Sequence, residues 1–109
     1  MKKKLMTRKE YLALIKKNYG KITKENCLWQ IKRVERNKQH NLELTSELQQ
    51  EIEWLNEGKA VNKQTEHRLK NKRYWQFYLT ETLYNFQTKV NWFEMELEVL
   101  NDIKKRIRE

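Results

Sequence analysis

The side chains best suited to chemistry lie in residues 70–86, KNKRYWQFYLTETLYNF, where a basic cluster runs into six aromatic residues. Aromatic rings stack on the bases of single-stranded nucleic acid, and nearby Lys and Arg side chains neutralise its phosphates. The aromatic residues also recur at the three- and four-residue spacing of a helix face, which is typical of packing. We therefore expect most of them to pack within the protein or against another chain, and base stacking is the alternative. In that alternative the basic cluster would bind phosphates, but the sequence offers it three glutamates first: Glu51, Glu53 and Glu57.

Residues that serve catalysis or metal binding are scattered along the chain. Cys27, His40 and His67 stand far apart, so their spacing does not match a zinc site. Acid–base catalysis needs carboxylates or histidines in a dry pocket, whereas both histidines lie in polar, charged stretches. Three alternate carboxylates are expected to form a solvated face: Glu94, Glu96 and Glu98. We expect a non-enzymatic protein with no catalytic residue, no metal site and no cofactor.

The amino-acid composition predicts the fold class. The chain of 109 residues has no proline and only two glycines, Gly20 and Gly58, and it is rich in residues that helices tolerate well. No Pro- or Gly-rich linker divides it, so residues 1–109 are expected to form one all-α domain. The basic start MKKK is followed by charged residues before any apolar stretch, and no apolar run approaches the roughly 20 residues of a membrane span. We expect a cytoplasmic protein without a membrane partner.

Capping residues define the first two helices. Thr7 and Glu10 have the spacing of a capping box, and Gly20 predicts a left-handed helix end, so the first helix is expected at about 8–19. Thr23 is the next N-cap, and the apolar pattern after it continues until Gly58, which predicts a second helix at about 24–57.

The third apolar pattern is the strongest and predicts a helix at about 61–107, with a bend near Asn71 or Asn91 as the alternative. The short connection at Gly58 makes it an antiparallel neighbour of the second helix. The expected fold is a long two-helix coiled-coil hairpin with the short first helix packed at its open end. Three polar residues interrupt the seam of the second helix and favour one register: Lys38, Asn41 and Thr45.

Charge is concentrated at both ends of the sequence. Residues 1–24 hold nine basic side chains and one acidic one, residues 103–109 hold four and one, and residues 25–102 hold 11 and 13. The hairpin brings these ends together, which predicts a basic tip for phosphates. The residues expected to bind nucleic acid, DNA or RNA, are Lys2, Lys3, Lys4, Arg8, Lys9, Lys16, Lys17, Lys21, Lys24, Lys104, Lys105, Arg106 and Arg108.

Some aromatic residues fall outside the expected hairpin seam. The third helix carries a second apolar stripe, and the first helix can cover only its part from Trp92 to Ile103. Exposed Trp and Tyr side chains are typical of protein interfaces, and homodimerisation is the simplest case. The expected interface residues are Trp29, Trp54, Tyr74, Phe77 and Tyr84.

Two functions fit these patterns. The first is an accessory protein that binds nucleic acid through its basic tip; small, Lys- and Asn-rich helical proteins are common in phages and other mobile elements, which is an association by composition. The second is a protein-binding inhibitor or adaptor that acts on a nucleic-acid-handling or defence complex. Residues 10–33 also have the outline of a helix-turn-helix, in which Lys21, Lys24, Gln30, Lys32 and Arg33 would face DNA, but we interpret them as a joint between packed helices.

Overall fold

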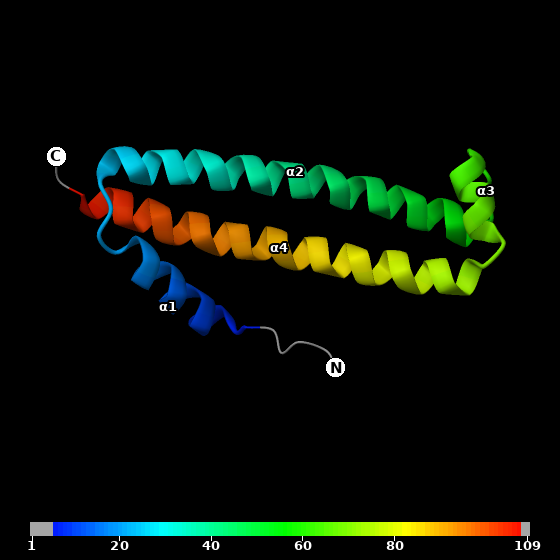
Figure 1. Ribbon diagram of the computed structural model, residues 1–109, viewed down its shortest axis with the longest axis horizontal. Helices are drawn as coiled ribbons and strands as arrows, with labels where there is room; N and C mark the ends of the chain where they lie inside the picture. The colour runs from blue at the N-terminus through cyan, green and yellow to red at the C-terminus, as the bar shows by residue number, and fades with distance from the viewer. Residues whose placement is uncertain (1–5, 108–109) are drawn as a thin grey trace. The chain divides into compact units, whose positions relative to one another are not determined.

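The computed structural model describes residues 6–107, and in this range the chain is all-α, with four helices and no strand (Figure 1). The helices are α1 (Arg8–Tyr19), α2 (Lys24–Glu57), α3 (Lys63–Leu69) and α4 (Lys72–Arg106). No helix in this range has the length and apolar character to cross a membrane.

The chain divides into two compact units that share the two long helices. Unit 1 contains α1, α2 up to Lys38 and α4 from Asn91, and unit 2 is Gln39–Val90, which includes α3. The expected single domain stays a prediction, as does the long coiled-coil hairpin.

The bounds of α1 and α2 agree with the prediction, and the threonine N-caps of both helices form as expected. The Thr7 side chain accepts a hydrogen bond from the Glu10 amide at 3.2 Å, and Thr23 accepts one from the Asn26 amide at 3.1 Å. After α2, Gly58 adopts a left-handed φ of 72°, and its neighbour Lys59 donates to the Trp54 carbonyl at 2.8 Å.

Gly20 differs from the prediction, because its φ of −63° is right-handed. Its role is steric: a Cβ at this position would lie 2.9 Å from the carbonyl oxygen of Lys16. A larger residue would therefore have to displace the end of α1.

The continuous third helix predicted at 61–107 is wrong, and the alternative of a bend near Asn71 is closer: the chain forms α3, breaks at Lys70 and Asn71, and continues as α4 through Asn91. Asn62 begins α3 with a reciprocal capping box to Thr65. At the break, the amides of Lys70 and Asn71 donate to carbonyls three residues back. The neighbour of α2 in unit 2 is therefore α4, and the 58–71 connection holds a helix of its own.

The core of unit 1 joins α2 to α4. Cys27, Ile31 and Val34 of α2 pack against Leu100, and the Cys27 thiol donates to the Leu100 carbonyl at 3.2 Å. The pKa of this thiol is raised, because the effect of burial outweighs the opposing effect of the positive charge of Lys104. Lys38, a polar residue of the predicted seam, forms an ion pair with Glu94 at 3.6 Å, which links α2 to α4.

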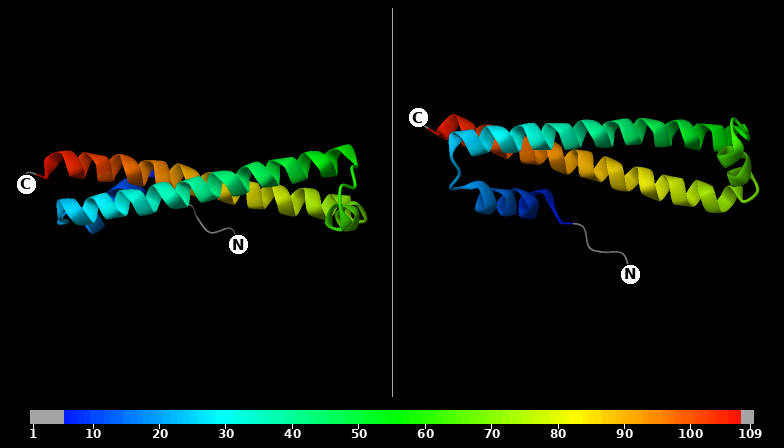
Figure 2. Two further views of the ribbon diagram at one scale, coloured as in Figure 1. Left: turned by 90° about the horizontal axis from the view of Figure 1, so that it is seen from above. Right: turned by 45° about the horizontal axis from the view of Figure 1, so that its top comes forward.

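In unit 2, Leu55 of α2 and Leu79 of α4 are buried, and α3 lies across the ends of the two helix segments (Figure 2). Arg68 of α3 is buried: its Nη1 forms an ion pair with Glu51 at 2.9 Å, and its guanidinium lies 5.2 Å from the ring centre of Trp75. The seam residue Thr45 donates to the Asn41 carbonyl within α2 at 2.8 Å.

Candidate nucleic-acid interface

The whole net charge of the protein belongs to unit 1. Its sequence holds 17 Lys and Arg against eight Asp and Glu, whereas unit 2 holds seven of each, so unit 1 carries the full +9. The basic residues predicted to bind nucleic acid all fall in unit 1. Four of them, Lys2, Lys3, Lys4 and Arg108, lie outside the described residues.

A groove between α1 and α4 brings two of these lysines together. It has a volume of about 380 Å³, and its lining includes Lys16, Lys105 and the apolar side chains of Leu12 and Val99. A second hollow on α1 is lined by Arg8, Lys9, Leu12, Ala13 and Lys16. Lys16 and Leu12 line both hollows, so the two hollows adjoin at these residues.

The carboxylates in this groove are already neutralised. Glu98 pairs with Arg8 at 2.9 Å, and Asp102 pairs with Arg106 at 3.1 Å. Lys16 and Lys105 form no ion pair with any residue between 6 and 107. The groove therefore offers two positive charges that are free to meet phosphate oxygens.

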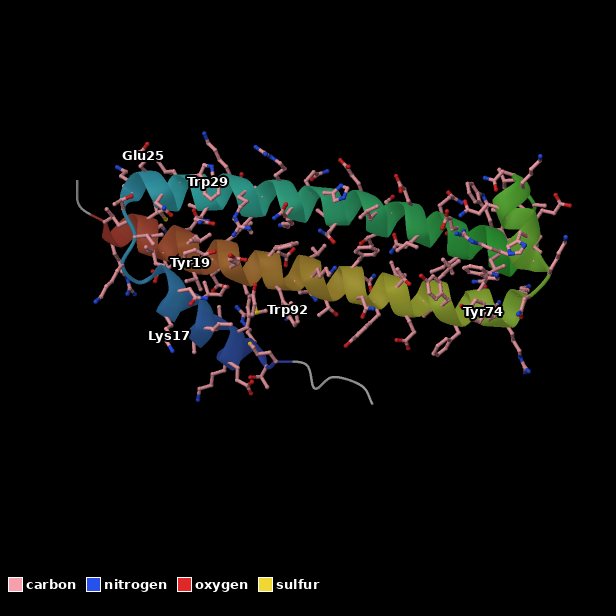
Figure 3. The ribbon with its side chains drawn as sticks, in the orientation of Figure 1. Lys17, Tyr19, Glu25, Trp29, Tyr74 and Trp92 are labelled. Carbon is pink, nitrogen blue, oxygen red and sulfur yellow. The ribbon has the colours of Figure 1, made fainter. Side chains whose placement is uncertain are left out.

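The other predicted basic residues also belong to unit 1. Lys9, Lys17, Lys21 and Lys104 are exposed and have no ion-pair partner within the described range, whereas Lys24 is half-buried at the start of α2. Figure 3 labels Lys17 on α1. Arg8 and Arg106 are less available than these lysines, because each already forms an ion pair, with Glu98 and with Asp102 respectively.

A polar cluster holds α1 on unit 1. Glu96 is only 7% exposed and accepts hydrogen bonds from the hydroxyls of Tyr19 at 2.9 Å and Tyr11 at 3.4 Å. Arg33 of α2 lies 3.8 Å from the same carboxylate. Tyr11 also stacks on Trp92 at 5.4 Å, and Tyr19 and Trp92 lie between α1 and α4 (Figure 3).

The expectation that Glu96 belongs to a solvated face is wrong. Its neighbours Glu94 and Glu98 are exposed, but Glu96 points toward α1, where two hydroxyls and one guanidinium satisfy it. Arg33, a DNA contact in the helix-turn-helix interpretation, is turned to this cluster. The sequence holds one indication of this contact: Tyr11 and Tyr19 lie on the apolar side of the first helix, which packs against α4.

This cluster predicts a loss of stability at high pH. Burial, followed by the negative charge of Glu96, raises the pKa of Tyr11 from 10.0 to about 12. Because the folded state holds this proton more tightly, its stabilisation is complete below pH 10 and is lost as the pH rises from 10 to about 12. Tyrosinate absorbance and thermal melting across this range measure both effects. Tyr11→Phe removes the late-titrating component; an identical titration curve in this variant contradicts the assignment.

The predicted interface residues divide by exposure. Trp29 is 60% exposed in unit 1, and Phe77 is 68% exposed in unit 2, where Tyr74 and Tyr84 are also more than half exposed. Trp54 is half-buried on α2. Tyr78, which the prediction omitted, is exposed too and stacks with Tyr74 at 6.2 Å.

The basic cluster that precedes these aromatic residues differs from expectation. Lys70, Lys72 and Arg73 form no ion pair with the glutamates of α2 in the described structure, and only Arg68 reaches Glu51. Lys72 donates to the Asn56 carbonyl at 3.2 Å instead.

No group of three or more potential metal-binding His, Cys, Asp or Glu side chains occurs within residues 6–107. Comparisons with protein-family models, with curated proteins and with solved structures give no match to this chain.

Proposed function

We propose that this protein is a non-enzymatic accessory protein that binds nucleic acid through unit 1. The observation that carries the proposal is the separation of charge: unit 1 has a net charge of +9, and unit 2 has none. A concentrated positive surface attracts phosphates and releases their counterions, so binding requires little recognition of base sequence. The Lys- and Asn-rich composition favours a phage or another mobile element as the source of such a protein.

The contacts to phosphate come from the groove and its surroundings. Lys16 and Lys105 line the groove, and Lys9, Lys17, Lys21 and Lys104 are further exposed lysines of unit 1. These are flexible point charges on helices, which suit a regular backbone of phosphates better than one particular base. We therefore propose binding with weak sequence preference, to DNA or RNA.

Titration of labelled DNA and RNA with the full-length protein tests this function. Six unpaired lysines predict a dissociation constant that rises by about three orders of magnitude between about 50 and 200 mM salt. A chosen duplex and a shuffled sequence of the same length should bind within a few-fold of each other. No binding at the lower salt concentration refutes the proposal.

A second candidate function is a protein-binding inhibitor or adaptor of a nucleic-acid-handling or defence complex. It is favoured by the exposed Trp29, because exposed Trp side chains are frequent anchors of protein interfaces. A pull-down from the native host separates the two functions. A stoichiometric protein partner that survives nuclease treatment and is lost with Trp29→Ala supports the adaptor, whereas recovery of nucleic acid alone supports the first proposal.

A further inference from the structure

The exposed rings of α4 in unit 2 form a surface that no described helix covers. Tyr74, Phe77, Tyr78 and Tyr84 are 49–68% exposed, and we call them the aromatic face of α4. Leu79 of the same helix is buried at 2% exposure. At about 100° per residue, Phe77 lies about 160° around the helix from Leu79, so it points away from the interior of unit 2.

Large apolar side chains of α4 are covered by a helix where one is available. In unit 1, Trp92 stacks on Tyr11 of α1, and Val99 is 4% exposed. Unit 2 has no such helix among the described residues, although its aromatic face includes four rings that are 49–68% exposed. Exposed aromatic side chains on one side of a helix are typical of an interface.

The charges beside the aromatic face complement each other under a two-fold rotation. Arg73 and Glu81 each lie four residues from Phe77, on opposite sides of it, and neither forms an ion pair within the described chain. Four residues make about one helical turn, so all three lie on the same side of α4. An antiparallel second α4 centred on Phe77 therefore places Arg73 opposite Glu81 of the second copy, twice.

We propose that the aromatic face of α4 binds a second copy of this chain, with the two α4 helices antiparallel and Phe77 at the two-fold axis. The contact is isologous, so it closes at a dimer. Four aromatic side chains of about 150–250 Å² each, roughly half exposed, supply about 400 Å². A standard interface buries about 800 Å² per partner, so flanking residues of α4 must add the rest and the dimer is expected to dissociate in the micromolar range.

The oligomeric state in the absence of nucleic acid tests this inference independently of the proposed function. Sedimentation equilibrium or light scattering over about three decades of protein concentration should show a monomer–dimer equilibrium. Phe77→Glu should yield a monomer at all concentrations with unchanged helicity by circular dichroism, because this side chain is 68% exposed. A wild-type protein that stays monomeric, or a dimer that Phe77→Glu leaves intact, overturns the inference.

A charge exchange tests the antiparallel register. Arg73→Glu puts two pairs of like charges across the axis, and Glu81→Arg does the same with the opposite sign, so each single variant should raise the dissociation constant about tenfold or more. The double variant Arg73→Glu/Glu81→Arg restores both attractive pairs and should restore dimerisation. A contact with another protein or with nucleic acid gives no such restoration. Failure of the double variant to recover the dimer refutes this register.

Discussion

Replacement of Lys9, Lys16, Lys17 and Lys105 with glutamine is expected to weaken nucleic-acid binding on the order of 100-fold at moderate salt. These lysines lie in unit 1, are exposed and form no ion pair with other described residues, so the substitution removes contacts to phosphate without leaving a carboxylate unpaired. The slope of log affinity against log salt should fall by about one for each lysine that contacts a phosphate. Fluorescence anisotropy at several salt concentrations measures both quantities.

A matched control changes the same number of charges in unit 2. Lys63, Lys70, Lys72 and Lys89 are exposed lysines of that unit, and their replacement with glutamine gives the same net charge of +5. If the basic surface of unit 1 holds the nucleic acid, the control keeps most of the wild-type affinity and salt slope. Equal losses in both variants mean that binding follows total charge, and the location of the interface is then wrong.

Replacement of Leu100 with alanine is expected to destabilise the protein by about 2–5 kcal/mol. Leu100 is fully buried in the core of unit 1, where it packs against Cys27, Ile31 and Val34. Its truncation removes apolar contacts and leaves a cavity between α2 and α4. Because a domain of this size is stable by about 5–15 kcal/mol, the loss is large.

Urea denaturation followed by circular dichroism measures this effect. Leu28→Ala is the control, because Leu28 is exposed although it adjoins Cys27 in sequence, and it should cost less than about 1 kcal/mol. Equal midpoints for the two variants contradict the assignment of the core. A change in the m value for Leu100→Ala alone indicates that this variant no longer unfolds in the same two-state transition.

The sequence predicts helix ends where they depend on residues close in the chain. Thr7, Thr23 and Gly58 define the ends of α1 and α2 through local hydrogen bonds and a left-handed φ, so their bounds follow from residue type and spacing. The break at Lys70 and Asn71 accompanies the contacts of Arg68 with Glu51 and Trp75, which involve three separate helices. Spacing alone does not reveal such contacts, although the Asn62 and Thr65 pair at the start of α3 was a readable local signal.

The sequence predicts the positive charge of the candidate interface but not which of its side chains are available to bind. Counting Lys and Arg locates the positive charge at the two ends of the sequence. Which lysines remain available depends on which carboxylates are already paired, and the Arg8–Glu98 pair joins residues 90 positions apart. The burial of Glu96 depends likewise on the tertiary contacts of Tyr11 and Tyr19.

The rate at which a reagent labels the buried thiol of Cys27 measures how often unit 1 opens. It is the only cysteine in the sequence, it is fully buried, and it donates a hydrogen bond to the backbone of Leu100. A thiol reagent can react with it only when α2 and α4 separate locally, since the reactive thiolate must be exposed. The rate of labelling therefore reports how often this part of the molecule opens. Comparing that rate with the rate of global unfolding shows whether unit 1, which carries all the net charge, opens locally or only when the whole chain unfolds.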